Sequence, residues 1–139
     1  MTTKAPLPES PAKRTLVFVV DDNELLGEIT RQLLGSAGYD TELFHQGLPA
    51  RDALMAASSP PAVLVTDFDI GDINGLDLIS QVRAKLPQIK ALLVSGTAKP
   101  ETLAKHPVKP DHFLPKPFRA DELIGAVDRL AAQSRGGTV

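Results

Sequence analysis

Four groups of polar residues in this 139-residue sequence follow short apolar segments, and their side chains suit the binding of a divalent cation and phosphate. Asp21 and Asp22 form the first group, and Asp67, Ser95 and Lys116 each follow a later segment. Neighbouring carboxylates repel and raise each other's pKa unless a positive charge neutralises them. Mg²⁺ prefers oxygen ligands and keeps coordination positions for water or phosphate oxygens. These residue types therefore indicate a magnesium site that can accept a phosphate group.

Each residue of this set has a separate role in phosphate chemistry. Asp22 and Asp67, with a backbone carbonyl, are suitable Mg²⁺ ligands. Lys116 supplies a positive charge, and Ser95 a hydroxyl donor, to the oxygens of a phosphoryl group. An aspartate carboxylate at a metal can attack phosphorus and carry the phosphoryl group as an acyl phosphate. Asp67, central in the set, is the predicted acceptor.

The apolar segments before these residues are predicted to be strands of one parallel sheet. The predicted strands are 15–20, 41–44, 62–66, 89–94 and 113–114. The predicted helices lie between Asn23 and Gly38 and over 49–57, 76–86, 101–105 and 121–132. Nearly continuous apolar strands alternating with helices predict an α/β, doubly wound fold with helices on both faces of the sheet. Ligands of such sheets bind at the carboxyl ends of the strands, where the polar residues lie. Prolines surround 101–105, so the fourth helix is predicted to be short or irregular.

Composition excludes several other kinds of site. With 15 Lys+Arg against 17 Asp+Glu, the chain has no charge excess for binding nucleic acid directly. It has no cysteine, which excludes disulfides, thiolate nucleophiles and cysteine-ligated metals. No apolar run reaches the ~20 residues of a membrane span, and no secretory signal begins the chain. We expect a cytoplasmic protein without a membrane partner.

The length predicts one folded domain. We expect a flexible N-terminal extension over 1–13, the domain over 14–132 and a flexible tail over 133–139. The initiating Met1 and the short tails favour a free-standing domain.

Four motifs in order along the chain resemble those of two-component response regulator receiver domains, in particular the single-domain chemotaxis type. They are Val-Val-Asp-Asp-Asn at 19–23, Val-Thr-Asp at 65–67 with Gly75 eight residues on, Val-Ser-Gly at 94–96 and Lys-Pro-Phe at 116–118. Each is weak alone, but together they cover about 15–132. The resemblance implies a flavodoxin-like five-stranded sheet of order 2-1-3-4-5.

The resemblance also implies an acceptor and a metal site. Asp67 is expected to accept a phosphoryl group from a histidine kinase or a histidine phosphotransfer protein. Mg²⁺ is expected between Asp22, Asp67 and the backbone carbonyl of Asp69, with Asp21 assisting through water.

A conformational switch and an output follow from the same resemblance. Ser95 is expected to turn toward the phosphoryl group, Lys116 to pair with it, and Phe113 to change rotamer. The Lys116–Pro117 bond is expected to be cis. The domain would signal to an unidentified downstream protein as a monomer or weak dimer, and would be a phosphoacceptor with at most slow self-dephosphorylation rather than an enzyme.

Three departures from the family pattern modify these expectations. Ile70-Gly71 stands where Met-Pro is common, which predicts a more flexible loop over the site. Asp69 adds a carboxylate, which predicts stronger dependence on metal and an altered phosphoryl lifetime. The segment 106–110 replaces the usual small residues, which disfavours dimerisation through the fourth helix and its neighbours.

Two other functions remain open on the sequence. Asp67-Phe68-Asp69 resembles the Asp-x-Asp nucleophile motif of haloacid-dehalogenase-type phosphatases. That family has the motif after its first strand and its acidic pair late, whereas here the acidic pair comes first. The other possibility is a receiver fold kept only for docking, which the retained acidic pair, Asp67, Ser95 and Lys116 disfavour. Taken alone, Asp21 and Asp22 are ordinary helix caps and Ser95 is an ordinary loop cap.

Overall fold

The centre of the molecule is a five-stranded sheet in which all neighbouring strands run parallel. The computed structural model describes residues 14–136. The strands are β1 (Leu16–Val20), β2 (Asp40–Phe44), β3 (Val63–Asp67), β4 (Lys90–Ser95) and β5 (His112–Pro115). The helices are α1 (Glu24–Ser36), α2 (Gly47–Ala56), α3 (Gly75–Lys85), α4 (Pro100–Lys105) and α5 (Ala120–Gly136). The order β2-β1-β3-β4-β5 confirms the predicted topology.

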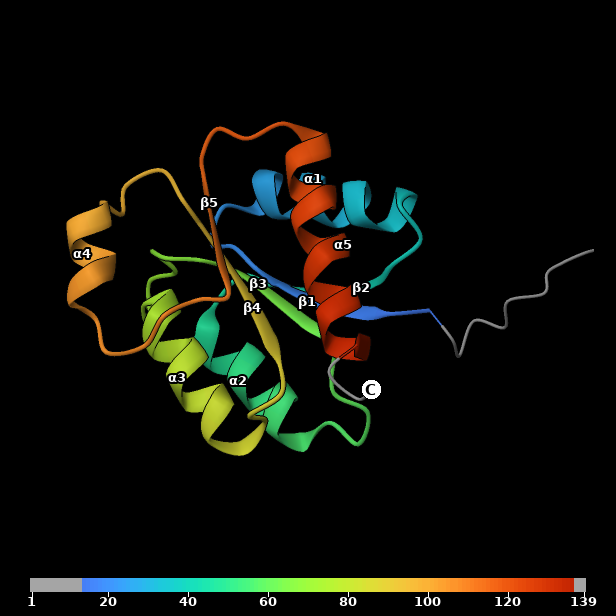
Figure 1. Cartoon of the computed structure of the whole chain (residues 1–139), viewed down its shortest axis with the longest axis horizontal. Helices are drawn as coiled ribbons and strands as arrows, with labels where there is room; N and C mark the ends of the chain where they lie inside the picture. The colour runs from blue at the N-terminus through green and yellow to red at the C-terminus, as the bar shows by residue number, and fades with distance from the viewer. Residues whose placement is uncertain (1–13, 137–139) are drawn as a thin grey trace, which may run out of the picture.

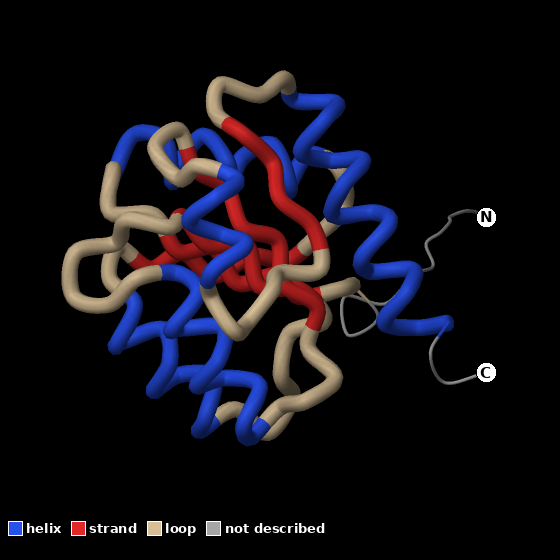
Figure 2. The backbone as a smooth tube through the Cα atoms, turned by 60° about the vertical axis from the view of Figure 1, so that its left-hand side comes forward, coloured by secondary structure: helices blue, strands red, loops and turns tan. Residues whose placement is uncertain are grey.

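Helices cover both faces of the sheet, as the apolar strands predict (Figures 1 and 2). Side chains alternate between the faces along each strand, so β1 contributes to two separate cores. Val17 and Val19 pack with residues of α1 and α5, whereas Phe18 and Val20 pack with α2 and α3. This double coverage holds the strand ends, and with them the polar residues that follow, in fixed positions.

The predicted element boundaries agree with the structure to within a few residues. Asn23 accepts a hydrogen bond from the Leu26 N–H at 3.0 Å and so caps α1, as its residue type predicts. Helix α2 begins at Gly47, earlier than predicted, because its cap comes from a distant loop described below. Helix α5 continues to Gly136, into the range expected for the tail.

The remaining terminal segments lie outside the described residues, so the predicted extension over 1–13 and the end of the tail at 137–139 stay predictions. Within residues 14–136, no helix has both the length and the apolar character needed to cross a membrane.

Helix α4 is short, as predicted, and has no buried residue. Its C-terminal end is held by Lys109, whose ammonium group donates hydrogen bonds to the carbonyls of Leu103, Ala104 and His106 at 2.8, 2.7 and 2.6 Å. A positive charge at this position also interacts favourably with the helix dipole. The lysine thus stabilises a helix that packing alone supports weakly.

Replacing Lys109 by Met should loosen α4 while leaving the rest of the fold intact. We expect amide hydrogen exchange within α4 to accelerate about threefold to tenfold, since a cap of this kind contributes roughly 1 kcal/mol. Global unfolding should change little because α4 buries no residue. Lys105→Met, on the same helix, is the matched control. Unchanged exchange in Lys109→Met would show that these hydrogen bonds do not stabilise α4.

Candidate functional site

Parallel pairing brings the predicted site residues to one edge of the sheet. The register of β1 on β3 places the residues that follow β1 beside Asp67, the last residue of β3. On the other side, the Lys116 N–H donates to the carbonyl of Ser95 at 2.9 Å, which extends the pairing of β5 with β4. Asp21, Asp67, Ser95 and Lys116 therefore lie together although up to 95 residues separate them in the sequence.

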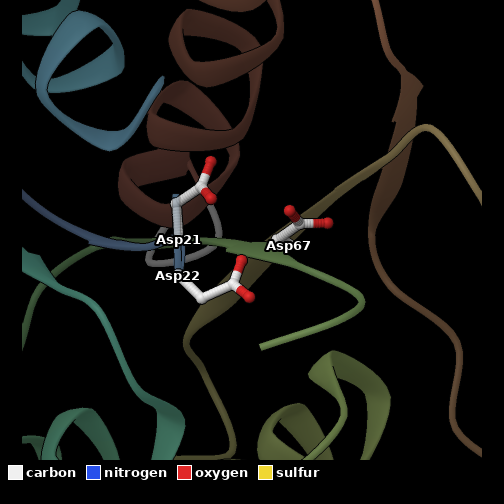
Figure 3. Close-up of side chains that lie close together, drawn as sticks. All are labelled: Asp21, Asp22 and Asp67. Carbon is white, nitrogen blue, oxygen red and sulfur yellow. The ribbon is translucent and has the colours of Figure 1, made fainter. Parts of the chain in front are cut away.

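Three carboxylates gather at this edge, from Asp21, Asp22 and Asp67 (Figure 3). One oxygen from each lies within 4.8 Å of the others. Asp21 is buried, whereas Asp22 is exposed at the mouth of the site. The Lys116 ammonium lies 2.9 Å from Asp67 Oδ2 and 3.3 Å from Asp21 Oδ2. The lysine offsets only part of the charge of the cluster.

Burial determines the protonation behaviour of the acceptor candidate. Desolvation raises the pKa of Asp67, and although the hydrogen bond and charge of Lys116 oppose it, the charge of Asp21 adds to the rise. For Lys116, burial alone would lower the pKa of the ammonium, but the hydrogen bond to Asp67 and the charge of Asp21 outweigh burial and raise it. Lys116 therefore remains a cation, and the ionised Asp67 is destabilised until more positive charge arrives.

The hydroxyl of Ser95 is committed to its own loop in this structure. Its oxygen accepts the N–H groups of Thr97 and Ala98 at 3.1 and 2.9 Å, which is the ordinary role of a serine in a turn. Thr97 in turn donates its hydroxyl to Asp69 Oδ2 at 2.5 Å. This contact joins the loop after β4 to the loop after β3, and no short-range pattern in the sequence predicts it.

The loop after β3 passes close to the carboxylates. Gly71 has a φ of 86°, in the left-handed region that favours glycine. Gly75 allows the loop to return, because a Cβ at this position would lie 2.3 Å from the Asp67 carbonyl oxygen. Together with Asp22, Asp69 and Ile70, Gly71 lines an open depression of about 350 Å³. The backbone of Asp69 is thus near the metal-ligand candidates.

The remaining predicted features lie close to the edge. The Lys116–Pro117 bond is cis, as expected. Phe113 is partly buried and packs against the core beneath α2 and α3.

Comparison with known proteins shows similarity over most of the chain. Residues 17–128 match the response regulator receiver domain family. The chain is 32% identical over 120 residues to the response regulator MprA of Mycobacterium avium, covering 86% of this chain and 52% of that protein. For MprA of Mycobacterium tuberculosis H37Rv the identity is also 32% over 120 residues, with 86% and 51% covered. The chain spans about half the length of the curated relatives it matches.

Solved structures with the same fold include receiver domains from distant organisms. A response regulator receiver protein from Sinorhizobium medicae is 26% identical, with a TM-score of 0.80 over 88% of this chain and 98% of that one. A CheY-like receiver domain from Methanospirillum hungatei is 18% identical, with a TM-score of 0.83 over 90% and 99% of the two chains. Because the family match covers almost the whole sheet and the four motifs meet at one edge of it, this chain belongs to the response regulator receiver domain family of two-component systems.

Proposed function

We propose that Asp67 is the phosphoacceptor and that it receives a phosphoryl group from a histidine kinase or a histidine phosphotransfer protein in the presence of Mg²⁺. The observation that carries the proposal is the placement of the Asp67 carboxylate at the end of a central strand, 2.9 Å from Lys116 and beside Asp21 and Asp22. This combination of a nucleophile, a cation and metal ligands is what phosphoryl transfer requires.

The carboxylate cluster has the chemistry of an Mg²⁺ site. Hard divalent cations take carboxylate and carbonyl oxygens, and the oxygens of Asp21, Asp22 and Asp67 lie close enough to share one ion. We assign direct contact to Asp22 and Asp67 and to the backbone carbonyl of Asp69. Asp21 is bonded to Lys116 and to the Asn23 N–H, which suits a contact through water. Bound Mg²⁺ would supply positive charge to the carboxylates and to the phosphoryl oxygens.

The transfer itself needs little rearrangement of Asp67. One carboxylate oxygen forms a bond to phosphorus while the bond from phosphorus to the donor histidine nitrogen breaks and its electron pair returns to that nitrogen. The Phe68 N–H, 2.7 Å from Asp67 Oδ1, orients the carboxylate. The Lys116 ammonium is already adjacent and can donate to the phosphoryl oxygens.

Signalling to a downstream protein would depend on movement of two side chains, those of Ser95 and Phe113. Because Thr97 donates its own hydroxyl to Asp69, the Ser95 hydroxyl, 3.3 Å from Thr97 Oγ1, would have to turn away from Thr97 to donate to the phosphoryl group. Phe113 lies three residues before Lys116 on the neighbouring strand. Their movement would shift the equilibrium between two conformations of a surface that a downstream protein recognises. In this proposal the domain acts in the cytoplasm, as a monomer or weak dimer, without steady turnover of a substrate.

Incubation with acetyl phosphate tests the proposal directly. Wild-type protein with Mg²⁺ should gain one phosphoryl group per chain by intact mass, and Asp67→Asn should gain none because it lacks the nucleophile. Chelation of Mg²⁺ should abolish the adduct.

Asp52→Asn is the matched control for this experiment, since Asp52 is exposed on α2 and pairs with Arg51 rather than with the site. An unmodified wild type that nevertheless binds Mg²⁺ would contradict phosphoacceptance and favour a docking module. Continuous release of phosphate from a small phosphate ester would instead favour the phosphatase.

Asp69→Asn should reveal the role of the additional carboxylate. Removing this charge should raise the Mg²⁺ dissociation constant about threefold to tenfold, since a charge a few ångströms away contributes roughly 1 kcal/mol in a hydrated site. It should also change the half-life of the phosphoryl group. Thr97→Val removes the hydroxyl bonded to Asp69 but keeps the charge, so its Mg²⁺ affinity should stay within about twofold of wild type. Equal affinity and equal decay in wild type and Asp69→Asn would contradict this role.

The raised pKa of Asp67 predicts an effect on stability. A raised pKa means that folding disfavours the ionised carboxyl, so the penalty is present above the folded-state pKa and disappears as the pH falls below the ordinary value of 3.8. In chelator at pH 7, Asp67→Asn should therefore unfold at or above the temperature of wild type. The difference should shrink in acid, and Mg²⁺ should reverse the order by stabilising wild type alone. A variant much less stable than wild type in chelator would show that pairing with Lys116 outweighs burial.

A further inference from the structure

Asp72 caps helix α2 from a loop 25 residues away. Its two carboxylate oxygens accept the backbone N–H groups of Gly47 and Leu48, each at 2.9 Å. Gln46, at the usual cap position, makes no side-chain hydrogen bond to the helix. Burial raises the pKa of Asp72, but hydrogen bonds from the backbone N–H groups of Leu48, Gly47, Asp72 and Ile73 together outweigh it, so the net pKa is lowered. The carboxylate thus satisfies two N–H groups that helix geometry leaves without partners.

The same contact is closely packed on its apolar side. A Cβ at Gly47 would lie 2.3 Å from Ile73 Cγ2 and 2.8 Å from Ile70 Cδ1. Ile70 is almost completely buried, with 1% of its surface exposed. Two contacts therefore hold the loop after β3 against the beginning of α2. One is the charged contact of Asp72, and the other is the apolar contact of Ile70 and Ile73 with Gly47.

The base of this loop is also closed. Gly75 donates its N–H to the carbonyl of Phe68 at 2.8 Å, and Asp69 pairs with Asn74 in an antiparallel bridge. The turn between these pairs contains Gly71. Within this turn, the Asp72 N–H donates to the carbonyl of Ile70 at 3.0 Å. Ile70-Gly71 in place of Met-Pro predicts a more flexible loop, whereas the structure surrounds Gly71 with residues held by these hydrogen bonds.

We propose that Asp72 is a positioning residue that fixes the backbone of Asp69 relative to Asp22 and Asp67. The inference rests on the proposed function, because it acts through the carbonyl that we assign to Mg²⁺. Asp72 contacts neither the carboxylate cluster nor Lys116 in any hydrogen bond of the described residues. Its effect would pass through the loop that it anchors, in the way that outer contacts orient the direct ligands of a metal.

Two substitutions at Asp72 test the proposal by calorimetric titration of Mg²⁺ into the full chain. Asp72→Ala should raise the Mg²⁺ dissociation constant about tenfold, the scale found for residues that orient metal ligands. Asp72→Asn keeps the size and one acceptor oxygen, so its effect should be intermediate. Phosphorylation by acetyl phosphate should slow at limiting Mg²⁺ and recover to within about twofold at saturating Mg²⁺, a pattern that a loss of stability alone would not produce.

Charge and anchoring must be separated, because removing any acidic residue weakens the attraction of a cation. Asp52→Asn removes the same charge from α2 without touching the anchor and should bind Mg²⁺ like wild type. Gly47→Ala keeps every charge but forces Ile73 and Ile70 away. It should therefore weaken Mg²⁺ binding in the same direction as Asp72→Ala.

Amide hydrogen exchange supplies the independent measurement. In Asp72→Ala, exchange should accelerate at Gly47 and Leu48 and also over 69–71. Faster exchange at Gly47 and Leu48 with unchanged Mg²⁺ affinity would overturn the proposal and leave Asp72 as a helix cap only. A wild-type chain that fails to bind Mg²⁺ or to be phosphorylated would refute the proposed function instead. In that case, amide exchange over 69–71 in Asp72→Ala would still test anchoring of the loop. Exchange as slow as in wild type would refute anchoring, and exchange faster than in wild type would support it.

Discussion

The carboxyl edge of the sheet carries more negative charge than its own cation neutralises, and the chemistry of the site depends on that excess. Asp21 and Asp67 share the ammonium group of Lys116, while Asp22 adds a third carboxylate at the mouth. Burial makes the ionised form of Asp67 still less favourable, because it raises the pKa of that carboxyl. Such a cluster is unfavourable for the protein alone but becomes favourable around a divalent cation. The fold thus holds a group of carboxylates with the chemistry of a divalent-cation site.

Only a scaffold that is stable elsewhere can hold repelling groups at short distance. The two cores supply that stability, since alternate residues of each central strand pack against helices on opposite faces. The residues just beyond the strands then have little freedom to separate. The packing of the apolar strands therefore holds the charged residues at the edge of the sheet in place.

The sequence was sufficient to predict the strands and the residues at their ends, because these follow from local patterns. The order of the strands came instead from the resemblance of the four motifs to receiver domains. Apolar runs give the strands, and a parallel sheet brings the carboxyl ends of its strands to one edge. What could not be predicted are contacts between loops. Nothing near Asp72 indicates that it caps α2, and nothing near Thr97 indicates that it meets Asp69. These pairs depend on how the loops pack against one another in the folded protein, and no short-range periodicity in the sequence indicates that packing.

The contacts between loops also define what the proposed phosphorylation of Asp67 would have to overcome. The Ser95 oxygen accepts two backbone N–H groups, and Thr97, the residue that supplies one of them, is bonded to Asp69. For the Ser95 hydroxyl to turn toward a phosphoryl oxygen, the gain from the new charge-assisted hydrogen bond would have to exceed the loss of its contact with Thr97. In the proposed function, a phosphoryl group on Asp67 would act on both sides of that balance, since its negative charge would attract the Ser95 hydroxyl and repel the carboxylate of Asp69. The loop that contains Asp69 and the loop that holds Ser95 would therefore respond to the same added charge.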